Sequence, residues 1–264
     1  MNREQICTPK RSGTMIELPH QSDANRFLGA LGPVEREMLS SHLQLVHLKS
    51  GQVLCEPGEQ LEHIYLPTTT VISLQYVLSD GMMLEVAQIG DEGLIGRQIM
   101  GGNGAIPCRV VTCRDGFSYR LREDLFSQTL DTSAAMRGLV LRCIQLLMMQ
   151  SAQISFCSRH HLLKNQLCRW LILAYDRSRS VEIKVTHNML AQMLGARRET
   201  VSDAAGEIQK MGLIHQHRSS IILADLHGLD AQACGCHTAI RKEMNRIFPG
   251  NIRTLLGLRL GKNA

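Results

Sequence analysis

The spacing of apolar residues changes along the chain and divides it into segments of different character. Residues 1–24 are polar and show no period, which predicts a flexible tail. Residues 25–130 begin with a short helical segment and continue as short apolar runs separated by the turn signals EPGE, SDG and GDEG. Many short strands at this spacing predict an antiparallel β-roll of the jelly-roll type.

In residues 131–159 the apolar positions recur in alternating steps of four and three. This period is that of a coiled-coil seam, and it predicts a dimerisation helix. Leu139 and Leu146 lie to one side of the seam, where they could pack on the β-roll of the same chain. An ordinary buried helix is the alternative. The predicted seam consists of Met136, Val140, Cys143, Leu147, Gln150, Ile154 and Cys157.

Residues 160–226 predict a winged helix-turn-helix, and the fold class of the whole chain is therefore α+β. Thr186 is a good N-cap for a helix through Leu194, Gly195 can end that helix, and a second helix runs to about Met211 before Gly212. Two short strands around the loop HRSS follow, which completes the motif. Before it, a helix over about 161–177 has an apolar side made of Leu162, Leu163, Leu167, Trp170, Leu171 and Ala174.

Residues 227–264 form a C-terminal extension, which either adds basic contacts to DNA or is solvated.

The two halves of the chain differ in net charge. Residues 25–130 carry 8 basic and 12 acidic residues, a net charge of −4, whereas residues 160–223 carry 9 and 5, a net charge of +4. This distribution favours contact between the second half and a polyanion. Aromatic residues make up only 4% of the chain, which argues against binding of single strands by stacking.

Nine scattered cysteines, together with an N-terminus that lacks an apolar signal core, predict reduced thiols and a cytoplasmic protein. We expect no apolar run long enough to span a bilayer, because Arg142 and Gln145 interrupt the best candidate. No nucleophile elbow, P-loop or HExxH motif is present, so we expect no enzyme.

The stretch LGARRETVSDAAGEIQKMGLI, from Leu194 to Ile214, gathers polar residues at the start of the second helix of the predicted motif. This helix end enters the major groove of DNA, where Arg matches guanine and Glu accepts from cytosine. Threonine and serine hydroxyls could hold phosphates. A solvated charged face on an ordinary helical hairpin is the alternative. The candidate DNA-binding residues are Thr186, Arg197, Arg198, Glu199, Thr200, Ser202, Asp203 and, in the wing, Arg218.

This stretch resembles the recognition segment of the Crp–Fnr family of bacterial transcription regulators. The glycine, the Arg-Glu-Thr-Val tetrad and the Gly-Leu-Ile end fall at the family's spacing, and the order of roll, long helix and winged motif matches over about residues 25–225. The resemblance implies that Arg198 and Glu199 read base edges. Asp203 stands where the family has a further, often basic, base reader. The wing has HRSS in place of the usual glycine turn, which puts phosphate contacts through Arg218 in question.

Cyclic-nucleotide members of this family carry a Gly-Glu pair and then an Arg-Ser pair that holds the phosphate. Here Arg97 follows Gly96 where Glu is expected, and Arg109 is displaced along its strand. A buried phosphate needs a paired cation and backbone donors, so an effector other than cyclic AMP is expected at Gly96, Arg97, Gln98 and Arg109. The alternatives are turn chemistry for Gly93, Gly96, Gly101 and Gly102 and, for the arginines, salt bridges to Glu85, Asp91 or Glu92.

Metal binding has weak support in the sequence, and we expect neither a metal nor a cofactor. Iron–sulfur members use several N-terminal cysteines, whereas only Cys7 lies there. Cys234, Cys236 and His237 offer suitable ligands for zinc, but C-x-C-H without a second ligand pair is a weak motif.

The resemblance implies a homodimeric transcription regulator that reads an inverted-repeat operator through the helix around residues 197–211, under the control of a small effector. Its expected partners are double-stranded DNA and a second copy of the chain, with RNA polymerase as a further candidate and no membrane. The alternative is a ligand-gated regulatory protein that has a cyclic-nucleotide-binding roll and no role on DNA.

Overall fold

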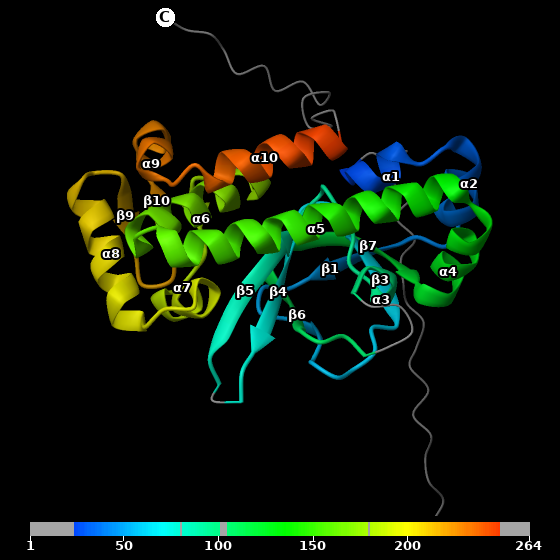
Figure 1. The fold of residues 1–264 in the computed structure, drawn as a ribbon, viewed down its shortest axis with the longest axis horizontal. Helices are drawn as coiled ribbons and strands as arrows, with labels where there is room; N and C mark the ends of the chain where they lie inside the picture. Colours follow the sequence, from blue (N-terminus) through cyan, green and yellow to red (C-terminus); the bar gives the residue numbers. More distant parts are fainter. Residues whose placement is uncertain (1–23, 80, 101–104, 179, 249–264) are drawn as a thin grey trace, which may run out of the picture.

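The computed structural model describes residues 24–248 apart from residues 80, 101–104 and 179. Nearly all of the predicted tail, the glycines at 101 and 102, and the end of the extension lie outside the described residues. The remaining chain forms a β-roll, one long helix, a winged helix-turn-helix and a final helix (Figure 1).

Strands β1–β7 form two antiparallel sheets, which confirms the predicted α+β class with a β-roll. Apolar side chains between Cys55 and Val110 form a buried cluster within the roll. One sheet has the order β1 (Gln44–Leu48), β7 (Gly116–Arg122), β3 (His63–Pro67), and the other has the order β2 (Val53–Cys55), β6 (Arg109–Arg114), β4 (Val71–Val77), β5 (Met83–Ile89).

Short helices surround the roll. The helical segment expected near the start is two helices, because Gly32 and Pro33 interrupt it and Pro33 takes the first helical position of the second. Phe27 of the first helix and Phe126 of the last are fully buried, so both helices complete the core of the roll. The four helices are α1 (Arg26–Ala30), α2 (Pro33–Ser40), α3 (Arg97–Met100) and α4 (Glu123–Thr132).

The long helix α5 (Ala134–His160) crosses the whole molecule, and the Ser133 hydroxyl caps its N-terminus (Figure 1). The predicted seam does not face outward. Met136, Val140, Cys143 and Cys157 are buried within their own protomer, and Gln150 accepts a hydrogen bond from the backbone N–H of Gln88. The expectation that these buried positions join two copies is not met, because β5 and the C-terminal helix of the same chain pack on α5, whereas Leu147 and Ile154 of the seam are half-buried.

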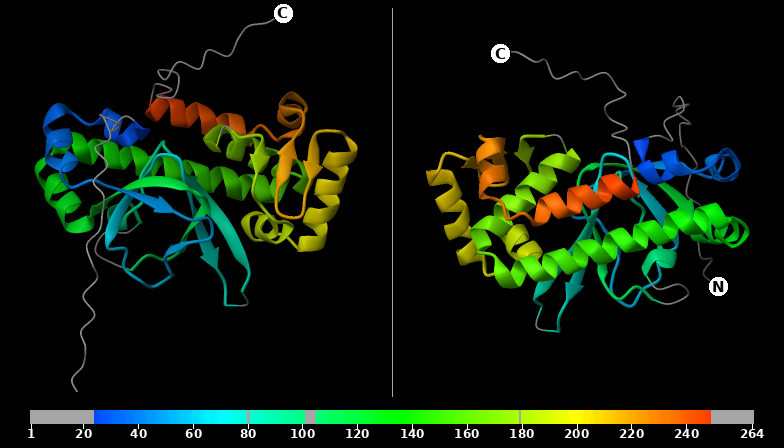
Figure 2. Two further views of the ribbon diagram at one scale, coloured as in Figure 1. Left: turned by 180° about the vertical axis from the view of Figure 1, so that it is seen from behind. Right: turned by 45° about the horizontal axis from the view of Figure 1, so that its top comes forward.

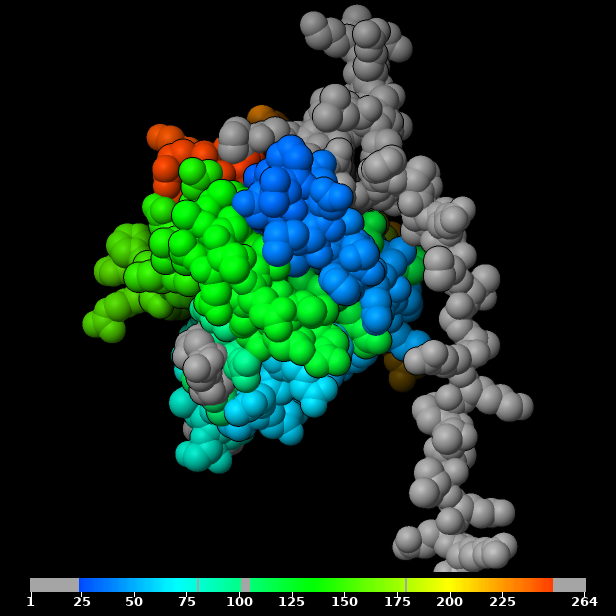
Figure 3. Space-filling model, turned by 90° about the vertical axis from the view of Figure 1, so that its right-hand side faces the viewer, coloured from blue at the N-terminus to red at the C-terminus, as the bar shows by residue number. Residues whose placement is uncertain are grey.

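A different face of α5 remains exposed. Leu141, Met148 and Phe156 are 64%, 69% and 52% exposed, although each is large and apolar. In the space-filling view, green and yellow-green side chains of the α5 region project from one side of the body (Figure 3). The helix thus has two apolar faces, and only one of them is covered within the protomer.

The length and composition of α5 also meet the criterion for a membrane-spanning helix, with a mean hydropathy of 1.3 over its best window. The expectation that no apolar run is long enough is therefore wrong, because two polar residues do not lower the hydropathy of such a long helix enough. Core helices of soluble proteins pass the same test, and α5 buries one face against the roll.

The winged helix-turn-helix follows directly after α5. Its core is apolar throughout, from Leu167 on the first helix to Leu223 on the last strand. Leu162 is an exception to the predicted apolar side, because it precedes the helix and is 73% exposed. The elements are α6 (Leu163–Ser178), β8 (Glu182–Ile183), α7 (His187–Leu194), α8 (Arg198–Lys210), β9 (Ile214–Gln216) and β10 (Ile221–Leu223), with strand order β8-β10-β9.

The C-terminal extension folds back onto the body of the protein. After α9 (Leu226–Gln232), helix α10 (Cys236–Ile247) lies along α5 and contacts α6 (Figure 2). Ile240, Met244 and Phe248 are buried in the same core cluster as the helices of the roll. The expectation of a DNA-contacting or solvated extension is wrong for this helix, because its apolar face supplies part of the core.

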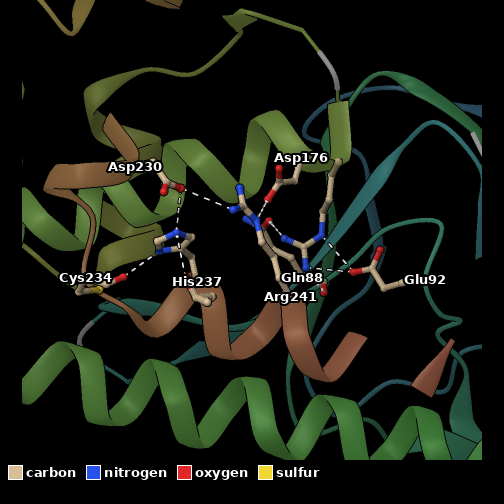
Figure 4. A network of polar contacts seen from close by, with 9 residues as sticks. Gln88, Glu92, Asp176, Asp230, Cys234, His237 and Arg241 are labelled. Atoms are coloured by element: carbon tan, nitrogen blue, oxygen red, sulfur yellow. Dashed lines mark hydrogen bonds and ion pairs between the residues drawn. The ribbon is translucent and has the colours of Figure 1, made fainter. Parts of the chain in front are cut away.

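A buried polar network joins the roll to the DNA-binding domain. Arg177 of α6 donates to Glu92 at 3.0 Å and 3.1 Å and to the Gln88 side chain at 3.1 Å (Figure 4). Nearby, the buried Glu85 accepts from the Trp170 indole at 3.2 Å. Burial raises the pKa of Glu85 despite its hydrogen bonds. The two domains are thus held together by groups that water does not reach.

Removing Arg177 should destabilise the protein strongly, because the Glu92 carboxylate would stay buried without its cation. We expect Arg177→Met to lower the free energy of unfolding by about 3–5 kcal/mol. Urea denaturation followed by the fluorescence of Trp170, the single tryptophan, measures this. The double variant Arg177→Met/Glu92→Leu should recover much of the loss. Arg122→Met, which breaks an exposed ion pair with Asp124, should change little. Equal effects of Arg177→Met and Arg122→Met would contradict this role.

Candidate nucleic-acid interface

The turn between α7 and α8 is fixed by local interactions. The Thr186 hydroxyl accepts from the backbone N–H of Met189 at 3.2 Å and so caps α7. Gly195 ends the helix at φ +60°, a left-handed conformation that costs glycine little. A Cβ at this glycine would also lie 3.0 Å from the Leu84 side chain of β5. The glycine therefore serves both the turn and the packing of the motif on the roll.

Helix α8 presents a polar end to solvent because its opposite face is anchored in the core. Val201, Ala205 and Ile208 are fully buried beneath it. Figure 1 shows this helix at the end of the molecule opposite α4. The side chains of Arg197, Arg198, Glu199, Thr200 and Asp203 are exposed, and within the described residues none of them has a side-chain partner.

Ser202, one of the predicted contact residues, supports the motif from within. The Ser202 hydroxyl lies 2.8 Å from Nδ1 of His187 and donates to the carbonyl of Arg198 at 3.0 Å. His187, the first residue of α7, thereby braces the two helices against each other, and the sequence analysis missed it. Its only sequence signal is a histidine directly after the N-cap Thr186. These contacts fix the angle at which the exposed end of α8 is held.

The wing closes without a glycine. The N–H of His217 donates to the carbonyl of Ser220 at 2.8 Å, so HRSS is a tight turn. Arg218 stands exposed in this turn. The Gln209 side chain of α8 accepts from the N–H of Gln216, which ties the wing to the second helix. The charged group of Arg218 is therefore presented from a hairpin joined to α8.

The predicted effector residues are engaged with carboxylates that the sequence analysis did not name. Arg97 pairs with Glu123 of α4, and Gln98 donates to the same carboxylate at 2.9 Å. Arg109 pairs with Glu56 at 2.8 Å. Salt bridges to Glu85, Asp91 or Glu92 were expected as the alternative for these arginines, and that choice of partners is wrong, because those carboxylates face α6 or the first helix.

The two arginines do not converge on one site. Arg97 lines a surface cavity of about 500 Å³ together with His63 and Glu123, and Arg109 is not among its lining residues. A Cβ at Gly96 would lie 2.0 Å from the Ile64 side chain, so this glycine permits close packing. The four-stranded sheet of the roll contributes buried apolar side chains to one cluster, and Tyr65 of β3 packs against this cluster.

The cysteine-rich tail meets the end of α5. Cys157 Sγ lies 3.3 Å from Cys234 Sγ, and Cys236 Sγ lies 3.6 Å from Nδ1 of His161. The hydrogen bond from Cys157 lowers the pKa of Cys234 to about 5, whereas that bond and burial raise the pKa of Cys157. His237, predicted as a ligand candidate, instead contacts Asp230 and the Cys234 carbonyl (Figure 4). The structure thus brings Cys157 and His161 beside Cys234 and Cys236.

Comparison with known proteins agrees with this geometry. Residues 165–232 match the family model of the Crp-like helix-turn-helix domain. The transcriptional regulator SdrP of Thermus thermophilus is 27% identical over 201 residues, which cover 70% of this chain and 92% of that protein. A transcriptional regulator assigned to the Crp/Fnr family from Eubacterium rectale has a similar fold, with a TM-score of 0.62, 15% identity and coverage of 80% and 98% of the two chains. FixK2 from Bradyrhizobium japonicum gives a TM-score of 0.61 at 12% identity, with coverage of 73% and 98%.

A β-roll, a long connecting helix and a winged helix-turn-helix with an exposed polar recognition end define a DNA-binding regulator. The chain is a DNA-binding transcription regulator with a Crp-like helix-turn-helix domain, and its fold is similar to that of Crp–Fnr regulators. The expected family and the expected DNA-binding function are confirmed, and the alternative of a regulatory protein without a role on DNA is not favoured.

Proposed function

We propose that this regulator binds an inverted-repeat operator as a homodimer, with the N-terminal end of α8 in the major groove. The observation that carries the proposal is the pair Arg197 and Arg198, exposed at the first turn of a helix whose other face is buried. Side chains at this end of a recognition helix reach base edges in helix-turn-helix complexes. Arg198 and Glu199 are the proposed base readers, and Arg218 in the wing is the proposed phosphate contact.

The roles of the remaining predicted residues follow from their contacts. Thr200 and Asp203 are exposed on the same end of α8 and lie within reach of the groove or its rim. Thr186 and Ser202 hold the motif through their hydroxyl groups, so we propose that they position α7 and α8 and do not read bases. Asp203, as an acidic residue, would favour a cytosine amino group over a guanine edge.

The exposed face of α5 supports the dimer. Leu141 and Met148 are seven residues apart and therefore share one face of the helix, and Phe156 continues the stripe toward its C-terminal end. A twofold axis beside α5 would bring two such stripes together and place two α8 helices on one side of the dimer. The operator should then contain two half-sites whose centres are about one helical turn of DNA apart.

The proposed site of action is the cytoplasm, where the chromosome is accessible, and contact with RNA polymerase remains a prediction. We further propose that the roll does not respond to cyclic nucleotides. Its core holds a cluster of buried apolar side chains, and both Arg97 and Arg109 already have carboxylate partners. A cyclic phosphate would have to displace those partners to gain a cation.

Arg198→Ala should remove selectivity and leave weak binding that is sensitive to salt. Loss of a bidentate contact to guanine typically costs about 1–3 kcal/mol at one base pair. Arg218→Ala should instead weaken binding to all sequences and reduce the salt slope by about one. Competition titrations with operator and scrambled duplexes at several salt concentrations separate the two. Wild-type selectivity in Arg198→Ala at matched salt would contradict base reading by this residue.

Met148→Asp should convert the dimer to monomers and weaken operator binding, because two carboxylates would meet across the apolar stripe. Analytical ultracentrifugation at micromolar concentration measures the assembly. Val34→Asp is the matched control, since it places the same charge on an exposed apolar residue at the N-terminal end of α2, where an acid is tolerated. A wild-type protein that sediments and binds its operator as a monomer would overturn the proposed dimer.

Cyclic AMP and cyclic GMP should leave the operator affinity unchanged. Fluorescence anisotropy with a labelled operator, titrated with each nucleotide, measures the coupling. An effector acts only if it binds two states of the protein unequally, and a tenfold change in affinity corresponds to about 1.4 kcal/mol of coupling. A gain of that size that is lost in Arg97→Ala would show that the roll does accept a cyclic nucleotide.

A further inference from the structure

Four side chains of metal-binding type converge where α5 meets the DNA-binding domain. Cys157 lies in the last turn of α5 and His161 is the C-cap of that helix, so the two side chains are one turn apart on the same face. Cys234 comes from the segment between α9 and α10, and Cys236 is the first residue of α10. The three Sγ atoms and the imidazole nitrogen all lie within 4.8 Å of one another.

These distances suit a single tetrahedral ion. Zinc bound to thiolates at about 2.3 Å places two ligand sulfurs roughly 3.8 Å apart. Cys157 Sγ and Cys234 Sγ are 3.3 Å apart, and Cys236 Sγ is 3.6 Å from His161 Nδ1. Thiolates and one imidazole are the donor set of structural zinc sites. A cluster of several iron atoms would hold its ligand sulfurs farther apart, because the metal atoms and sulfides lie between them.

The surroundings also fit a metal centre. The Gln153 amide donates to Cys236 Sγ at 3.0 Å. Three thiolates around a divalent ion leave a net charge of −1, and the buried Arg169 interacts favourably with Cys157 and Cys234. Within the described residues, Nε of Arg169 has no hydrogen-bond partner. A buried cation beside the cluster offsets the charge that the bound ion would leave.

His237 holds the segment that carries two of the ligands. Its Nδ1 lies 2.8 Å from the Cys234 carbonyl, and its Nε2 lies 2.9 Å from Asp230, so the ring is fixed at both ends (Figure 4). Groups of this kind orient ligands without touching the ion. The sequence motif CGCH therefore contributes two ligands and one positioning residue.

We propose that Cys157, His161, Cys234 and Cys236 bind one zinc ion, which ties the end of α5 to the C-terminal extension. Helix α6 begins at Leu163, two residues beyond His161, so the ion would sit at the connection between α5 and the DNA-binding domain. Binding requires deprotonated thiols and releases their protons to solvent. Because the ligands come from segments that are 77 residues apart, metal binding and the docking of α10 are linked.

The test uses the full chain, purified under reducing conditions, and needs no DNA. Elemental analysis should find about one zinc per chain, and Co(II) substituted for zinc should give the intense visible absorption of a tetrahedral, thiolate-bound ion. Cys157→Ser, Cys236→Ser and His161→Gln should each lose the stoichiometric ion. His161 is partly exposed, so its variant is the least disruptive of the three.

Matched controls separate the site from general effects of losing a cysteine or a histidine. Cys113→Ser keeps a donor to the Val71 carbonyl and should retain the ion. His160→Gln, at the neighbouring exposed histidine, should also retain it. His237→Gln should still bind one ion, with an affinity lower by about 10–100-fold, as expected for a residue behind the ligands. Chelation should lower the Tm of the wild type and of the controls but not that of Cys236→Ser.

Three results would overturn the proposal. The first is Co(II) binding that is unchanged in the Cys236→Ser and His161→Gln variants when both are folded by circular dichroism. The second is iron with inorganic sulfide in place of zinc. The third is a Cys157–Cys234 disulfide in the native, metal-free protein as purified. Because the readouts are metal content, absorption and Tm, the outcome is independent of whether the proposed operator contacts are correct.

Discussion

The buried ion pair between Arg177 and Glu92 determines how the DNA-binding domain sits on the roll. Both side chains are almost fully enclosed, and the guanidinium also donates to the Gln88 side chain and backbone. A buried charge is tolerated only when its partners are in place, so few relative positions of the two domains are compatible with this pair. The same α6 that carries Arg177 packs against α8, and the direction of the recognition end is therefore set by an interaction on the opposite side of its domain.

Helix α5 connects the core of the roll to the DNA-binding domain. One of its faces completes the core of the roll, while the other exposes Leu141 and Met148. At its far end, the chain enters α6 after Cys157 and His161. A change in the relative position of the two domains would therefore have to be accommodated both at the Arg177 pair and at the junction between α5 and α6.

Local signals made the DNA-binding motif predictable from the sequence. Pairings between residues far apart in the chain could not be predicted in this way. Thr186 and Gly195 act within one turn of chain, so the bounds of α7 were visible in the sequence. The three-four period of α5 revealed a helix with an apolar face, but a period does not say whether that face is covered by the same chain or by another. The partners of Arg97 and Arg109 are 26 and 53 residues away, and no local pattern indicates them. The same holds for the metal-binding group, since the pair Cys157 and His161 gains meaning only when α10 brings the tail beside it.

The docking of α10 has a consequence for how the protein is made. Ile240, Met244 and Phe248 complete a core whose other members include Phe27 and Leu28 near the start of the chain. The first and the last described elements are thus assembled together, and a nascent chain on the ribosome lacks part of this core until its final helix emerges. Until then, the apolar surface of α5 that α10 covers stays open to chaperones and proteases.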